Sequence, residues 1–226
     1  MKRGLVVVAV LFALAWMVWA TGRYSWHQKL TITVETPAGD VSGSAVSAVS
    51  WRKQWFRWDG MGWSYDLTGE ALVVEVTPGR YLFALLKGAG TTEYMGSVAA
   101  ASIVGREGRV LDAALFSEVE GKRGQMITVP VYQYPMMVTF DDITKPETVP
   151  EVDPDDLAAV FGEGVRLKAV TLEITREAMT EGRVEGVLGW MPDYPEAPII
   201  PKVDPMDFSL SATLRQGDFI RRNGAL

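Results

Sequence analysis

Residues 29–49 read KLTITVETPAGDVSGSAVSAV, and this stretch predicts the start of the fold. Leu30, Ile32 and Val34 alternate with polar residues, which is typical of a strand with one buried face. Residues 36–40 then supply proline, glycine and aspartate, the residue types of a tight turn, and a second apolar alternation follows. We therefore expect two antiparallel strands that open a β-sandwich.

Two more hairpins are expected in the first half of the chain. Residues 51–67 form the first, with Asp-Gly-Met-Gly at 59–62 as its tip, because glycine provides the positive φ that a tight connection needs. Residues 71–76 and 80–86 form the second, joined by Thr77-Pro-Gly, which suits a type II turn. Short strands at this spacing indicate an all-β unit.

The second half mixes strands with short helices. Apolar residues at 110, 111, 114, 115 and 119 have the period of an amphipathic helix. The remaining expectations are an edge strand at 126–134 that contains Pro130, a core strand at 136–140, a short helix capped by Asp153, a strand at 165–175, a short helix at 181–188 and a final hairpin through 216–218.

The predicted fold class is α+β, mainly antiparallel β, with an N-terminal hydrophobic helix. The first half is β-sandwich-like, and the second is another β region with short helices. The expected organisation is a signal anchor or signal peptide at 1–22, a juxtamembrane linker at 23–28, a β-sandwich-like region at 29–96 and an α+β region at 97–226.

The N-terminus has the order of an export segment. Lys2 and Arg3 precede an uninterrupted apolar run from 5 to 20. Basic residues stay on the cytoplasmic side, so the chain after Ala20 is expected in the periplasm, attached by a single pass through the inner membrane. Aromatic residues gather where a membrane helix leaves the hydrocarbon, and four of them near the end of the run favour a retained anchor: Trp16, Trp19, Tyr24 and Trp26. The alternative is cleavage near Ala20 and release into the periplasm.

Composition excludes several classes of protein. The chain has no cysteine and one histidine, His27, which removes disulfide scaffolds, thiolate nucleophiles and histidine-based triads. Of 22 basic and 28 acidic residues, only Lys2 and Arg3 lie before the apolar run, so the part after it carries 20 basic against 28 acidic residues. This acidic balance argues against a nucleic-acid partner. No cofactor is expected, because no phosphate-binding glycine loop or metal-ligand spacing is present.

An aromatic and basic stretch at 51–65 is the most unusual local composition. Trp55, Arg57, Trp58 and Trp63 are candidate ligand-binding residues, since flat rings beside guanidinium groups stack on sugars or on a partner's apolar surface. The competing interpretation is that these rings pair across the hairpin and fill the sandwich.

Carboxylates gather between 141 and 163, where eight acidic residues face one basic residue. Asp141 and Asp142 are candidate acid and base groups for a glycosidic bond. Asp153, Asp155 and Asp156 are candidate calcium ligands, although helix capping also explains them.

Four segments resemble a family of small bacterial exported or membrane-anchored proteins with no assigned activity. They are VTFDDITKP at 138–146, VDPDDLAA at 152–159, GVRLKAVTLEIT at 164–175 and ETPAGDVSGSA at 35–45. The resemblance implies an envelope protein and carries over no catalytic residue.

The sequence therefore predicts a membrane-anchored or exported envelope protein that acts as a binding or structural module for a protein or glycan partner. The alternatives are a carboxylate-dependent carbohydrate-active enzyme and an accessory subunit of a membrane complex.

Overall fold

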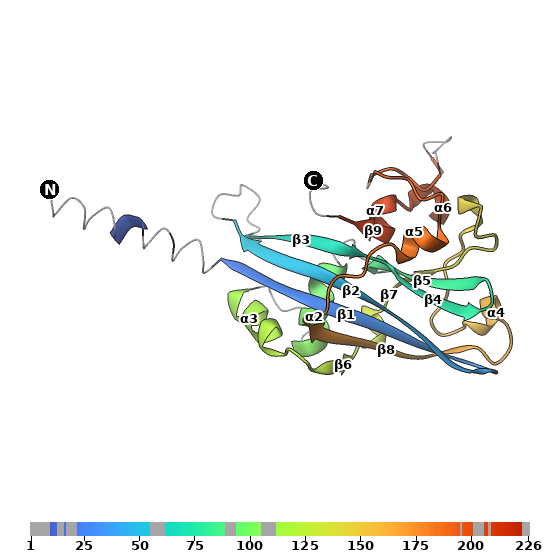
Figure 1. The fold of residues 1–226 in the computed structure, drawn as a ribbon, viewed down its shortest axis with the longest axis horizontal. Coiled ribbons are helices and arrows are strands. Elements are labelled where there is room, and N and C mark those ends of the chain that lie inside the picture. Colours follow the sequence, from blue (N-terminus) through green and yellow to red (C-terminus); the bar gives the residue numbers. More distant parts are fainter. Residues whose placement is uncertain are drawn as a thin grey trace.

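The computed structural model describes residues 10–12, 16, 22–54, 62–88, 94–104, 112–194, 196–200, 206–207 and 209–222. These residues form an α+β fold with two antiparallel sheets and a few short helices (Figure 1). The α+β class and its mainly antiparallel strands are confirmed.

The larger sheet has six strands in the order β6-β8-β1-β2-β3-β9. Their bounds are β1 Arg23–Thr36, β2 Gly39–Lys53, β3 Trp63–Glu70, β6 Met126–Thr128, β8 Arg166–Thr175 and β9 Ile220–Arg221. Two of the central strands, β1 and β2, are the longest, and they pair along their whole length from Arg23↔Arg52 to Thr36↔Gly39.

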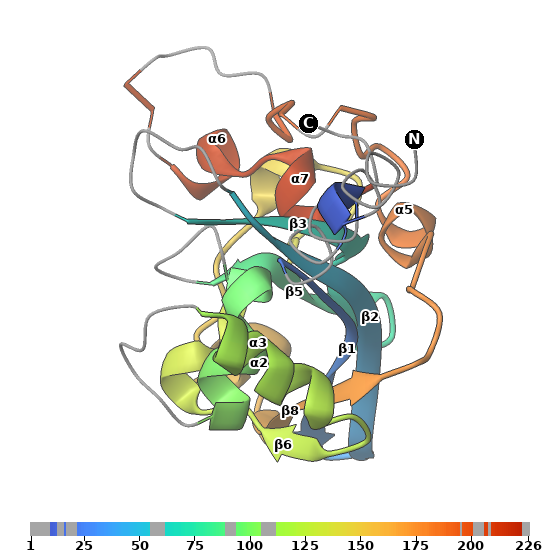
Figure 2. The same ribbon diagram turned by 90° about the vertical axis from the view of Figure 1, so that its left-hand side faces the viewer.

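The smaller sheet has the order β4-β5-β7, with β4 at Leu72–Thr77, β5 at Arg80–Gly88 and β7 at Pro135–Val138. The helices are α2 Tyr94–Val104, α3 Ala113–Gly121, η1 Val131–Gln133, η2 Pro146–Thr148, α4 Ala158–Phe161, α5 Arg183–Val187, α6 Leu210–Thr213 and α7 Gln216–Phe219. Helices α2 and α3 lie on one face of the β1–β2 hairpin and α5 lies on the other (Figure 2).

The alternation of residues 30–34 gives β1 its buried face, as predicted. Leu30, Ile32 and Val34 are at most 2% exposed, whereas Thr31 and Thr33 point to the opposite side. The strands β8 and β2 continue the same buried face, because directly paired residues of antiparallel strands share a side.

The two sheets approach most closely where β4 crosses β2. A Cβ atom added at Gly43 would lie 2.4 Å from the backbone oxygen of Val73 and 2.8 Å from Cγ2 of Val74. Only glycine fits at position 43, because any side chain would push the sheets apart.

The expected linker at 23–28 is corrected by the structure, since these residues are the first part of β1. Trp26, predicted at a membrane interface, is 3% exposed, and its indole Nε1 donates to Gln28 Oε1 at 3.0 Å. Gln28 is itself buried and donates to the backbone oxygen of Met95 in α2 at 2.7 Å. A hydrogen bond to a residue 67 positions away therefore helps to hold the segment that was predicted to be a linker.

The expected boundary at residue 96 does not separate two sheets. It lies inside α2, and β1 pairs with β8 from the other side of it. In the smaller sheet β5 likewise pairs with β7. Strands from both halves of the chain therefore build each sheet.

Phe116 of α3 is the centre of an aromatic cluster under the six-stranded sheet. Its ring stacks on Trp51 at 4.9 Å between centroids and meets Trp63 edge-on at 4.9 Å. Tyr24 and Trp26 also contact it, at 5.5 and 6.3 Å. Phe116 is completely buried, so these rings form part of the hydrophobic core.

The predicted hairpin at 216–218 is wrong. The backbone N–H of Arg215 donates to Asp218 Oδ2 at 2.9 Å, which starts the short helix α7, and Phe219 is fully buried against Phe83 and Phe140. Capping and burial together outweigh the turn preference of Gly217.

The expected N-terminal helix lies almost entirely outside the described residues. Across the described part of the chain, helices are too short or too polar for a membrane crossing.

Candidate functional site

The outer face of the six-stranded sheet, opposite α2 and α3, is rich in hydroxyl groups. Pairing places the following residues on this side: Ser25, Thr31, Thr33, Ser42, Ser44, Ser50, Thr68 and Thr171. Large apolar side chains are replaced there by small polar ones, so the face can accept hydrogen-bonding groups along its length.

A strap formed by residues 176–182 crosses this face between β8 and α5. The backbone N–H of Thr180 donates to the oxygen of Val46 at 3.0 Å, and Thr180 Oγ1 accepts from the N–H of Val46 at 2.9 Å. Glu177 forms an ion pair with Lys29 at 2.8 Å, and its backbone oxygen lies 2.7 Å from His27 Nδ1. The strap is therefore bonded to both β1 and β2.

The strap takes the place of β3 beside β2. The pairing of β3 with β2 ends at Thr68, and β3 turns away at Gly69, whose φ is +152°. A Cβ atom at Gly69 would lie 2.7 Å from Cβ of Ser47, so only glycine can pass this closely. The backbone of Val46, which lies beyond the β2–β3 pairing, bonds to Thr180 instead.

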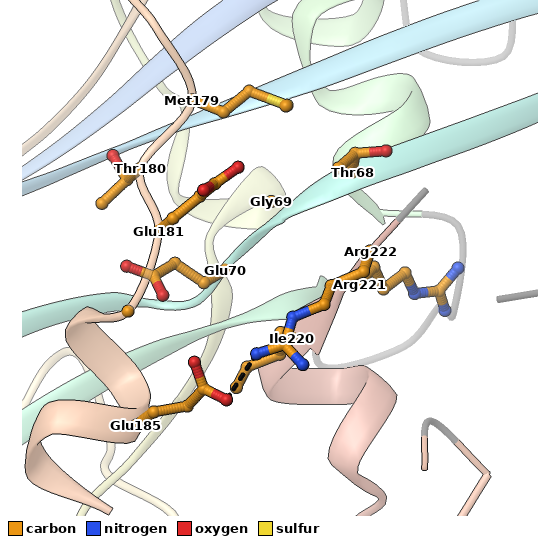
Figure 3. Close-up of a pocket in the computed structure, with 11 residues that line it drawn as sticks. Thr68, Gly69, Glu70, Met179, Thr180, Glu181, Glu185, Ile220, Arg221 and Arg222 are labelled. Atoms are coloured by element: carbon orange, nitrogen blue, oxygen red, sulfur yellow. Dashed lines mark hydrogen bonds and ion pairs between the residues drawn. The ribbon is translucent and has the colours of Figure 1, made fainter. Parts of the chain in front are cut away.

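The first hollow, called the Glu70 hollow, lies where β3, the strap and β9 meet (Figure 3). Its volume is about 450 Å³. Most of its lining residues have polar or charged side chains: Thr68, Gly69, Glu70, Met179, Thr180, Glu181, Gly182, Glu185, Ile220, Arg221 and Arg222.

Glu70 is 3% exposed, and its carboxylate accepts hydrogen bonds from backbone N–H groups of α5. The N–H of Arg183 donates to Oε1 and Oε2 at 3.0 and 3.1 Å, and that of Val184 donates to Oε2 at 3.5 Å. Burial raises the pKa of this carboxyl, the hydrogen bonds oppose the rise, and the charge of Glu185 adds to it. Glu70 therefore joins the end of β3 to α5.

The rim of this hollow carries charges of both signs. Glu185 forms an ion pair with Arg222, and the exposed Glu181 lies on the strap close enough for its charge to act on the same guanidinium. Figure 3 shows these side chains around the opening. Carboxylates and hydroxyls in this arrangement can accept hydrogen bonds from a polyhydroxylated or cationic ligand.

The second hollow, called the arginine hollow, lies on the same face toward the start of β1. It also measures about 450 Å³. Its lining residues are Ser25, Trp26, His27, Ala48, Val49, Ser50, Asp66, Thr68, Arg123, Thr175 and Arg176. Thr68 lines both hollows, so they follow one another along β3.

A third hollow of about 390 Å³ lies toward the other end of β1. It is lined by Lys29, Thr31, Ser42, Gly43, Ser44, Met126, Thr171, Glu173 and Arg183. The outer face thus offers polar space over most of its described length.

The predicted aromatic site is described only at Trp63. Its ring is half-buried, edge-on to Phe116 and 5.8 Å from Tyr24. Trp55, Arg57 and Trp58 lie outside the described residues. A stacking surface at this hairpin stays a prediction.

Asp141 and Asp142 lie in the turn after β7, away from the hollows. Asp142 Oδ1 accepts from the N–H and Oγ1 of Thr144 at 3.0 and 2.7 Å, and Oδ2 pairs with Lys145 at 3.0 Å. These contacts lower the pKa of Asp142 to about 2. Its carboxylate holds the turn, and the assignment of an acid and base pair here stays a prediction.

Two of the three other candidate aspartates accept backbone hydrogen bonds at the turn before α4 and at its start. Asp153 Oδ1 accepts from the N–H of Asp155 at 2.9 Å, and Asp156 Oδ1 accepts from Ala159 at 3.1 Å. The helix α4 begins at Ala158 with Leu157 as its N-cap residue, so the predicted cap at Asp153 is wrong. Within the described ranges, His, Asp and Glu side chains form no group of three that could hold a metal ion.

The residues of the hollows carry no local signal in the sequence. Ser25, Ser50, Asp66 and Arg176 come from four different segments. The pairing of β1 with β2 and β8, together with the pairing of β2 with β3, brings them together. Glu70 has one weak signal, because it is a charged residue directly before the apolar run at 71–74.

Comparison of the chain with protein-family models, with curated proteins and with solved structures found no significant match. The resemblance to bacterial exported proteins stays a prediction.

Proposed function

We propose that the chain is a cell-envelope binding module that takes a polyhydroxylated ligand, such as a glycan chain, on the outer face of its six-stranded sheet. The N-terminal apolar segment attaches it to the inner membrane, with the folded part in the periplasm. The basic pair at 2–3 and the apolar run at 5–20, which ends close to the start of β1, support this attachment.

The observation that carries the binding proposal is the pair of hollows that share Thr68. Each has a volume within the range of small-molecule sites, about 300–1,000 Å³. Together they place hydroxyls, carboxylates and guanidinium groups along one line, which suits a ligand with repeated hydroxyl groups. A chain-like ligand would contact both hollows at once.

Binding can be tested with chitotetraose and isolated peptidoglycan sacculi as probes for the full chain in a neutral detergent. The variant Thr68→Val with Glu181→Gln removes one hydroxyl and one charge from the Glu70 hollow. We expect affinity for the bound probe to fall on the order of tenfold.

The matched control is Thr213→Val with Glu163→Gln, which makes the same chemical changes at exposed positions in α6 and after α4. It should bind like the unmodified chain. Absence of binding to either probe, or equal loss in both variants, would refute the glycan assignment.

Membrane attachment is tested separately by alkaline carbonate extraction of membranes that contain the full chain. If the anchor is retained, the protein stays in the pellet and its N-terminal sequence is unprocessed. Release into the supernatant with a new N-terminus after Ala20 would support the cleaved alternative.

A second candidate function, carbohydrate cleavage, is favoured by the raised pKa of Glu70 beside Glu185 in one hollow. Reducing ends released from chitotetraose would report it. An enzyme that uses Glu70 loses this activity in Glu70→Gln, whereas one that uses the turn after β7 loses it in Asp141→Asn with Asp142→Asn.

A further inference from the structure

The arginine hollow contains two cations that have no acidic partner among the described residues. Arg123 follows α3 and Arg176 follows β8, and both are exposed. Neither forms an ion pair or a hydrogen bond with another described residue, whereas Lys29 and Arg52 on the same face pair with Glu177 and Asp66. Since Asp66 is already neutralised by Arg52, the hollow itself has a net positive character.

Side chains with hydrogen-bonding groups lie beside these two guanidinium groups. The lining includes the hydroxyl residues Ser25, Ser50 and Thr175, together with His27. Guanidinium forks combined with hydroxyls are the usual protein partners of a phosphate group, because they supply several N–H and O–H donors in fixed directions. The hollow therefore fits an anion that bears phosphate oxygens.

The surrounding end of the molecule carries more basic than acidic residues, with Glu120 of α3 accepting a hydrogen bond from the backbone N–H of Ser25 at 2.8 Å. Arg23 pairs in register with Arg52, Lys53 ends β2, and Lys122 precedes Arg123. The acidic window at 141–163 is remote from this end, since α4 lies at the far side of the fold from the start of β1 (Figure 1). Charge is thus separated along the long axis of an overall acidic protein.

The chain itself indicates which anionic surface is near. Arg23 opens β1 only three residues after Ala20, the last residue of the apolar run. A bilayer entered by that run places its headgroup layer within a few residues of the basic end. Anionic lipids attract basic side chains at this distance and repel the acidic window.

We propose that the arginine hollow binds the phosphate of an anionic phospholipid headgroup, so that the folded part stands on the membrane by the end where β1 starts. The inference rests on the membrane attachment proposed above. Carbonate extraction reports that attachment alone, whereas lipid binding in detergent reports the hollow alone, so the two can fail independently.

The test uses the full chain in a neutral detergent and follows thermal unfolding with three added probes at equal concentration: dihexanoyl phosphatidylglycerol, dihexanoyl phosphatidylcholine and inorganic phosphate. We expect phosphatidylglycerol alone to raise Tm in a concentration-dependent manner. In Arg123→Gln with Arg176→Gln, its apparent affinity should fall about thirtyfold.

The control is Arg166→Gln with Lys168→Gln, which removes two exposed positive charges at the opposite end of β8. It should keep the affinity of the unmodified chain. The lysine variants Arg123→Lys and Arg176→Lys keep the charge, so they should bind more weakly than the unmodified chain and more tightly than the glutamine variant.

Three outcomes would overturn the proposal. Equal stabilisation by inorganic phosphate would assign the hollow to a free anion. Equal stabilisation by phosphatidylcholine would show that headgroup charge is not recognised. An unchanged affinity in the glutamine variant would place lipid contact elsewhere.

Discussion

Glu70 Oε1 lies 3.0 Å from the backbone nitrogen of Arg183, a residue 113 positions further along the chain. This contact ties the end of β3 to the first turn of α5, and it is made by a carboxylate that is almost fully buried. The structure therefore depends on an ionisable group in its interior.

Replacing Glu70 by alanine should lower the free energy of unfolding by roughly 1–3 kcal/mol, because the N–H groups of Arg183 and Val184 lose their acceptor. Urea denaturation followed by circular dichroism measures the loss. A change within experimental error of zero would show that water replaces the carboxylate.

Stability should also depend on pH through Glu70. Its pKa in the folded state is raised above 4.5, so the folded state binds the proton more tightly than the unfolded state does. The free energy of unfolding should therefore fall as pH rises from about 4.5 toward the folded pKa. Glu70→Gln should remove this part of the slope, and Glu163→Gln, at an exposed site, should leave it unchanged.

Phe116→Ala should cost about 3–5 kcal/mol, since Phe116 is fully buried and contacts several aromatic rings. The same denaturation experiment applies, and near-ultraviolet circular dichroism should lose intensity as Trp51 and Trp63 become less ordered. Tyr132→Ala is the control, because Tyr132 is 55% exposed and should matter little.

Gly43→Ala should destabilise the protein, because the new methyl group would lie 2.4 Å from the backbone oxygen of Val73. The identical substitution at Gly186 meets nothing within 4 Å and falls inside α5, where alanine is favoured by up to about 1 kcal/mol. Opposite shifts in Tm are expected, and two losses of similar size would contradict the close crossing of β2 and β4.

Asp142→Asn should alter acid stability. The pKa of Asp142 is lowered to about 2 from 3.8, so its ionised form supports the folded state above pH 3.8, and this support is lost as pH falls through about 2. The asparagine variant should show a weaker acid dependence between pH 4 and 2. A carboxyl titration by NMR with a midpoint near 3.8 would refute the proposed role of Thr144 and Lys145.

Much of the β structure could be predicted from local pattern. The alternation around Ile32, the turn at 36–40 and Pro78-Gly79 each specify their hairpin through neighbouring residues alone. Predictions failed where distant contacts decide the outcome. Trp26 is buried because α3 brings Phe116 to it, and Gln28 is buried because α2 offers the backbone oxygen of Met95.

The candidate site was beyond the reach of local pattern for the same reason. The residues that line the hollows include members of β1, β2, β3 and the strap. Their separation along the chain does not indicate how close they lie in the folded protein. Tryptophans and paired aspartates attract notice in a sequence, yet the described members of those sets pack against Phe116 or hold turns.

The position of β1 also has a mechanical consequence. A pull on the chain at Arg23 acts along a 14-residue strand that is bonded on one side to β2 over its whole length and on the other to β8. Hydrogen bonds between antiparallel strands run across this direction, so they share the load instead of opening one after another. The fold is therefore suited to resist tension that is applied at Arg23.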